Sequence, residues 1–140
     1  MSSRDIEHVT KLDEWFFSNL EGISCSDDAR AYVAGVLSAF RSAKNDLGNA
    51  SVSIAYLEAK QQGEFCLYQR VGDWILWTSV IHPKRFDSER NLYESLVSLS
   101  YDACDRILLR KWKLYNELAR NFPAISKDAR CKLEGNLVIL

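Results

Sequence analysis

Asp73 is the residue whose neighbours most suggest chemistry. It belongs to the segment GDWILWTSVIHP (residues 72–83), where the tryptophans Trp74 and Trp77 follow it closely. A carboxylate among apolar side chains must find a hydrogen-bond donor or take up a proton, and burial raises its pKa. Since perturbed pKa values gather at functional sites, one interpretation is a buried acid at such a site. The other, which we favour, is an N-cap that restarts a helix after Gly72.

An aromatic pocket for a flat ligand is the functional alternative to a hydrophobic core in this region. Its wall would consist of Asp73 and four aromatic side chains: Trp74, Trp77, Trp112 and Tyr115. Yet the bulky side chains of residues 64–81 point in nearly every direction around a helix, as in the central element of a bundle. Pro83 disfavours helical geometry at His82 and ends the segment there. We therefore interpret the tryptophans as core.

The basic segment RILLRKWK, residues 106–113, is a candidate contact for nucleic-acid phosphates. Its four cations are Arg106, Arg110, Lys111 and Lys113. If the segment is helical, three of them follow each other by four and three positions and share a face. The alternative is the solvated side of an amphipathic helix, with Asp102 and Glu117 as ion-pair partners. Because the formal net charge is −1, we favour the solvated side.

The chain ends on apolar residues, whereas termini are usually polar and frayed. These residues are Leu137, Val138, Ile139 and Leu140. If this tail, residues 136–140, is ordered, it must pack against an apolar surface. We favour its own core, and an interface with a second chain is the alternative.

Chemistry that needs a recognisable linear motif is not expected. The chain has two histidines, His8 and His82, and its four cysteines lie too far apart in sequence for a metal site or a C-x-x-C redox site. The cysteines are Cys25, Cys66, Cys104 and Cys131. There is also no glycine-rich phosphate loop and no G-x-S-x-G motif. We expect no metal and no cofactor, and these absences weigh against an enzyme without excluding one.

Composition points to an ordinary globular protein. The 140 residues are 47% hydrophobic and 26% charged. A net charge this small creates no field that would attract nucleic acid or an anionic membrane. The N-terminus lacks the pattern of a secretory signal, and no apolar run approaches the ~18 residues of a membrane span. We expect a cytoplasmic protein with reduced thiols and no membrane partner.

The elements that would position these residues are helices, because apolar residues recur at helical spacing along most of the chain. Ser26, followed by two aspartates, marks the clearest helix start, and Gly22 and Gly63 mark helix ends. The expected helices cover about residues 4–20, 27–40, 52–62, 64–81, 88–122 and 126–135.

This pattern predicts a single all-α domain over residues 1–140. It is a bundle of five to six helices with an apolar central helix and a long C-terminal helix. The alternation of apolar and polar residues in SVSIAYLE leaves an α+β fold as the alternative, with a small hairpin within residues 51–81.

Residues 88–122 contain neither Gly nor Pro and would form a helix about 50 Å long, which Pro123 should end. That is long for so small a domain, so the helix either breaks around Ser98–Ser100 or projects to meet a partner. With the apolar tail, this length favours a protein–protein interaction or self-associating accessory module, for example a homodimer. The alternatives are nucleic-acid binding through residues 106–113 and small-molecule binding in the aromatic pocket.

Overall fold

The computed structural model describes residues 3–43 and 51–134, and these residues form seven α-helices and no strand. The helices are α1 (Ser3–Asn19), α2 (Asp27–Ala43), α3 (Val52–Gln62), α4 (Phe65–Ile81), α5 (Pro83–Ser88), α6 (Arg90–Ile107) and α7 (Lys113–Leu133). The all-α prediction is confirmed. The helix that was not expected is α5, which directly follows α4.

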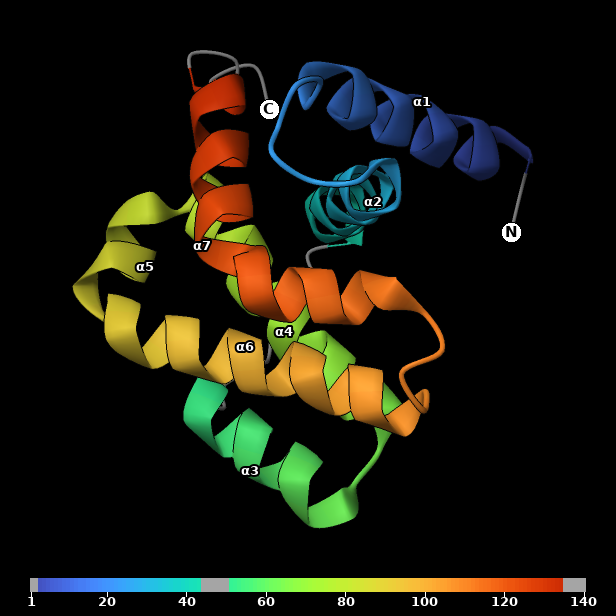
Figure 1. The fold of residues 1–140 in the computed structure, drawn as a ribbon. Helices are drawn as coiled ribbons and strands as arrows, with labels where there is room; N and C mark the ends of the chain where they lie inside the picture. Colours follow the sequence, from blue (N-terminus) through green and yellow to red (C-terminus); the bar gives the residue numbers. More distant parts are fainter. Residues whose placement is uncertain (1–2, 44–50, 135–140) are drawn as a thin grey trace.

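Helix α4 is the central element of the bundle, as its apolar pattern predicted. It packs against α2, α3, α5, α6 and α7, and Figure 1 shows it behind α6 and α7 in the middle of the molecule. Its buried residues occupy most of the circumference of the helix: Tyr68, Val71, Gly72, Trp74, Ile75, Leu76, Thr78, Ser79 and Val80. A helix with so small a polar face is stable only when other elements cover most of its surface, and here the exposed residues of α4 are Cys66 and Arg70.

Helix α3 resolves the ambiguity between a helix and a hairpin. The Ser51 hydroxyl accepts a hydrogen bond from the Ile54 N–H at 3.2 Å and caps the start of the helix. Gly63 ends it with a φ of 66°, and its N–H donates to the Ala59 carbonyl at 2.7 Å. Both are common end signals of a helix. The alternative of a hairpin within residues 51–81 is therefore wrong.

The long C-terminal helix is divided, but at a different place from the one expected. Helix α6 runs through Ser98–Ser100 without interruption, and the break falls at residues 108–112. The expectation that Pro123 ends the second helix is also wrong, because α7 continues through this proline to Leu133. Consequently residues 88–122 do not form one helix of about 50 Å that projects from the bundle. Helices α6 and α7 instead pack against each other.

The backbone hydrogen bonds that the two prolines of the chain cannot donate are replaced by hydrogen bonds from side chains of other helices. Proline has no N–H, so Pro123 leaves the Ala119 carbonyl without its helical donor, and the Ser98 hydroxyl of α6 donates to it at 3.1 Å. Pro83 likewise cannot donate to the Ser79 carbonyl. Arg130 does so instead, from Nε at 3.2 Å and Nη2 at 3.0 Å. Figure 1 shows α7 changing direction midway along its length, as a proline inside a helix causes.

A double-mutant cycle tests this compensation. Ser98→Ala is expected to lower the free energy of unfolding by about 1 kcal/mol, because the Ala119 carbonyl loses its donor. In a Pro123→Ala background the same substitution should have a smaller effect, since the N–H of residue 123 can then donate to Ala119. Urea unfolding of the four proteins measures the coupling. Equal effects of Ser98→Ala in both backgrounds would contradict the assignment.

Helices α1 and α2 are joined to the rest by polar contacts at the start of α2. Ser26 caps α2 as predicted, because its hydroxyl accepts the Ala29 N–H at 3.1 Å. The Glu117 carboxylate of α7 in turn accepts the Ser26 N–H at 2.7 Å and the Ser26 hydroxyl at 2.5 Å. Glu117 was expected to pair with the basic segment, and that expectation is wrong. It holds α7 against the start of α2.

Candidate functional site

Asp73 lies in the middle of α4, so the favoured interpretation of Asp73 as an N-cap is wrong. Its Oδ1 atom accepts two phenol hydrogen bonds, from Tyr32 of α2 at 2.6 Å and from Tyr101 of α6 at 2.8 Å. The carboxyl group therefore joins three helices from inside the bundle. The burial that the alternative interpretation expected is observed, and a functional role for this buried acid stays a prediction.

The network extends to α7 through Tyr115. Its ring lies edge-on to that of Tyr32, with centroids 5.6 Å apart, and its hydroxyl accepts a hydrogen bond from the Gln69 amide at 2.9 Å. We call these residues the Asp73 cluster: Asp73, Tyr32, Tyr101, Tyr115 and Gln69. Four helices thus meet at one set of hydrogen-bonded polar groups.

Gly72 permits the close approach of α6 that this cluster requires. A Cβ atom at position 72 would lie 2.7 Å from Cε1 of the Tyr101 ring, which is inside van der Waals contact. Tyr101 is fully buried, and its hydroxyl is held by the neighbouring Asp73. Only the absence of a side chain at position 72 lets the ring pack this closely against α4.

Burial sets the protonation behaviour of the cluster. Desolvation raises the pKa of Asp73 from 3.8 to about 6, although the hydrogen bonds from Tyr32 and Tyr101 oppose the shift. Desolvation and the nearby Asp73 charge raise the pKa values of Tyr32 and Tyr101 far above the ordinary phenol value. The phenols thus stay protonated as donors, and Asp73 is the member that gains or loses a proton near neutral pH.

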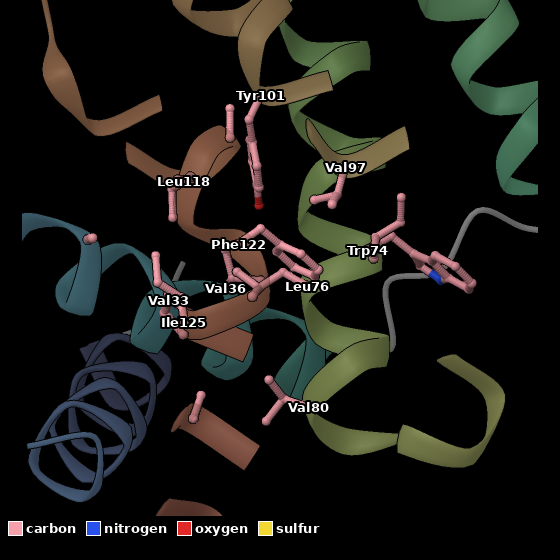
Figure 2. Close-up of a cluster of buried hydrophobic side chains, with 14 of the residues drawn as sticks. Val33, Val36, Trp74, Leu76, Val80, Val97, Tyr101, Leu118, Phe122 and Ile125 are labelled. Carbon is pink, nitrogen blue, oxygen red and sulfur yellow. The ribbon is translucent and has the colours of Figure 1, made fainter. Parts of the chain in front are cut away.

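The tryptophans do not join Asp73 in a single pocket. Trp74 packs edge-on against Tyr93, and Trp77 stacks on Phe40, with ring centroids 6.1 and 6.0 Å apart. Figure 2 shows Trp74 extending to the other side of the α4 ribbon from Leu118 and Val33. Of the five residues proposed for the pocket, Asp73 and Tyr115 lie together, with Trp112 at the edge against Tyr115, 5.7 Å between centroids.

The basic segment is a turn, not a helical face. After α6 ends at Ile107, Leu109 and Arg110 have φ angles of 57° and 56°, so the expected common face of Arg106, Arg110 and Lys113 does not form. Two arginines are neutralised locally. Arg106 pairs with Asp102 at 3.2 Å, and Arg110 pairs with Asp102 and with the buried Asp105.

Large apolar side chains are exposed on the same turn. The exposed fractions are 72% for Leu109, 48% for Trp112 and 40% for Ile107. Lys111 and Lys113 are exposed beside them and form no ion pair with any residue of the described ranges 3–43 and 51–134. We call residues 106–113 the α6–α7 turn. It combines an apolar tip with unpaired positive charge.

The apolar tail, Leu137, Val138, Ile139 and Leu140, lies outside the residues that the structure describes. Among the described residues, no three His, Cys, Asp or Glu side chains are grouped to hold a metal ion. No helix of this part of the chain is both long and apolar enough to cross a membrane.

Comparison with known proteins adds no relative. The chain matches no protein-family model, no curated protein and no solved structure. Any functional conclusion therefore depends on the contacts of its own residues.

The sequence pattern did not identify Tyr32, Tyr101 and Gln69 as members of the Asp73 cluster. A signal for the tyrosines was present, since a buried phenol hydroxyl usually needs a partner and Tyr32 lies on the apolar face of α2. Asp73 was the available acceptor in the most apolar helix. Gln69 gave no such signal, because a glutamine at a partly buried helix position is common and does not require a particular partner.

Proposed function

We propose that this chain is a protein-interaction module that binds a partner protein through the α6–α7 turn. The observation that carries the proposal is Leu109, a leucine that is 72% exposed and held at a φ of 57°. Large exposed apolar side chains that a defined backbone presents are typical of interaction sites.

Leu109 lowers the stability of the isolated chain in two ways. The Leu109 N–H donates to Arg106 and the Arg110 N–H to Asp105, both at 2.9 Å, so α6 ends in a Schellman motif with Leu109 in its left-handed position. Glycine is usual there, since the left-handed conformation costs other residues roughly 1–2 kcal/mol. The exposed side chain also gains nothing from burial. A contact outside the chain accounts for both features.

The neighbours of Leu109 indicate the chemistry of the partner. Ile107 and Trp112 extend the apolar tip, and tryptophan is among the residues that contribute most to binding energy in interfaces. Lys111 and Lys113 flank the tip with unpaired positive charge. We infer a partner surface with an apolar recess and carboxylates at its rim.

Nucleic acid is the less favoured partner. Arg106 and Arg110 are paired with aspartates of α6, which leaves two free lysines, and leucine and isoleucine make no contact that phosphates favour. A non-enzymatic role in the cytoplasm accords with the proposal, and the partner can equally be a second copy of the chain.

Leu109→Asn tests the proposal without disturbing the turn, because asparagine tolerates the left-handed conformation. A photo-crosslinking residue in place of Ile107 first captures the partner, and the affinity of the purified pair is then measured. Leu109→Asn should raise Kd by about tenfold or more while leaving Tm unchanged or higher. The matched control is Leu57→Asn, which changes a leucine that is 60% exposed on α3.

Two results would count against the proposal. One is an unchanged Kd for Leu109→Asn, and the other is crosslinking to nucleic acid alone. Capture of a second copy, with a dimer in light scattering that Leu109→Asn abolishes, would identify the chain as its own partner.

A further inference from the structure

A cavity of about 500 Å³ lies where α5, α6 and the second half of α7 meet. Its lining combines aromatic, basic and small residues: Phe86, Arg90, Glu94, Phe122, Pro123, Ala124, Ser126, Lys127, Arg130 and Cys131. A second cavity of about 500 Å³ adjoins it and shares Glu94, Phe122 and Pro123. The first volume falls in the range of small-molecule sites, roughly 300–1,000 Å³.

The apolar wall of the first cavity comes from two buried rings and a proline. Phe86 and Phe122 are 3% and 2% exposed, and their centroids lie 6.0 Å apart. Pro123 lines both cavities at the point where α7 bends. The bend that Ser98 supports therefore also shapes this wall. Because the two rings are almost completely covered, the apolar surface that a planar group can reach is that of the exposed Pro123 and Ala124.

The basic residues of the wall are held in place by hydrogen bonds. Arg130 is fixed by its two bonds to the Ser79 carbonyl, and Asp87 lies 3.5 Å from its Nη1 atom and 2.6 Å from Nη2 of Arg90. The guanidinium carbons of Arg90 and Arg130 lie 5.9 and 6.0 Å from the centroid of the Phe86 ring. Positive charge is thus set beside the aromatic wall before any ligand arrives.

The charges do not cancel. The hydrogen bond from Arg90 lowers the pKa of the Asp87 carboxyl group, which is therefore ionised at neutral pH. Three cations, Arg90, Lys127 and Arg130, face two carboxylates, Glu94 and Asp87, which leaves one positive charge in excess. Lys127 forms no ion pair with any described residue. An excess of one charge fits a monoanion.

We propose that this cavity binds a small organic monoanion with a planar apolar body, of the class of aromatic carboxylic acids. The ring lies against Pro123 and Ala124, above the buried Phe86 and Phe122 side chains, and the carboxylate faces Lys127 and Arg130. This site is separate from the α6–α7 turn and does not depend on the interaction proposed for that turn.

Alkylation of cysteine provides a test with an internal control. Cys131 is exposed and lines the cavity, whereas Cys66 is exposed on α4 and does not. 2-Naphthoate at about ten times its Kd should slow the reaction of iodoacetamide with Cys131 by about tenfold, by mass action, and leave Cys66 unaffected. 2-Naphthylmethylamine carries the same ring with a positive charge, and inorganic phosphate carries negative charge without a ring. Neither should protect Cys131.

Three variants test whether 2-naphthoate binds to the charged wall of the cavity. Lys127→Gln should raise the Kd of 2-naphthoate by about tenfold, the typical effect of losing a charged hydrogen bond. Asp87→Asn should lower Kd, because it releases Arg90 and Arg130 from a competing carboxylate. Lys84→Gln changes an exposed lysine of α5 outside the lining and should have no effect. Equal protection by the amine, an unchanged Kd for Lys127→Gln, or no protection at millimolar 2-naphthoate would each overturn the proposal.

Discussion

Replacing Gly72 with alanine is expected to lower the free energy of unfolding by about 2 kcal/mol. The added methyl group would lie 2.7, 2.8 and 3.0 Å from three atoms of the Tyr101 ring. Overpacking of this kind costs roughly 1–3 kcal/mol or more, and the gain of about 1 kcal/mol from alanine in a helix offsets only part of it. The ring cannot move aside easily, because it is fully buried and its hydroxyl is bonded to Asp73.

Gly35→Ala is the matched control for this substitution. Gly35 also lies inside a helix, α2, but a Cβ atom there meets nothing within 4 Å. The same change should therefore raise the free energy of unfolding by about 0.5–1 kcal/mol, since glycine in a helix interior is destabilising. Urea unfolding of both variants checks the pair. A neutral Gly72→Ala would show that α4 and Tyr101 pack less closely than described.

Removing the charge of Asp73 is expected to have the largest effect, and that effect depends on pH. The pKa of Asp73 is 3.8 without the surrounding protein and about 6 in the folded chain. The folded state therefore binds this proton more tightly than the unfolded state, and stability falls as pH rises from about 4 to about 6. A shift of this size corresponds to about 3 kcal/mol, present in full below the unfolded pKa and lost above the folded one.

Asp73→Asn isolates this contribution, because the amide oxygen can still accept hydrogen bonds from Tyr32 and Tyr101. Other carboxyl groups also titrate in this range, so the informative quantity is the difference in unfolding free energy between the variant and the wild type. That difference should move in favour of the variant by about 2.4 kcal/mol between pH 4 and pH 7, since at pH 4 the unfolded carboxyl group is already partly ionised. A difference that stays constant over this range would mean that Asp73 titrates alike in both states.

The fold was largely predictable because its signals are local. Apolar residues in nearly every direction around residues 64–81 predicted a central helix, which α4 is. Gly63 predicted the end of α3, and the helix does end there, with Gly63 at a φ of 66°. The position of the α6–α7 break was not predictable in this way. It depends on Leu109 and Arg110 adopting a conformation usual for glycine, and the ion pair of Arg110 with Asp105 accompanies it.

The contacts that the sequence pattern did not predict join residues that are far apart in the sequence. Pro123 stays inside α7, and its missing donor comes from Ser98, whose acceptor Ala119 is 21 positions away. Tyr32 and Tyr101 are 41 and 28 positions from Asp73. The apolar sequence around Asp73 showed that a carboxylate there needed partners. The packing of the helices decides which of them supply these partners. The periodicity of apolar residues along one segment carries no information about how that segment packs against others.

The two proline contacts make helix length a property of the assembled bundle. A peptide of residues 113–133 alone would lack the hydroxyl that donates to the Ala119 carbonyl. The two halves of α7 on either side of Pro123 would then behave as separate short helices, which are marginal in water. The half of α7 after the proline carries Arg130, which donates hydrogen bonds to the Ser79 carbonyl near the end of α4. If α6 and α7 separated, α7 would unwind near Pro123 and the Ser79 carbonyl of α4 would lose its donor at the same time. The backbone amides of α4, α6 and α7 should therefore lose their protection from hydrogen exchange as one unit.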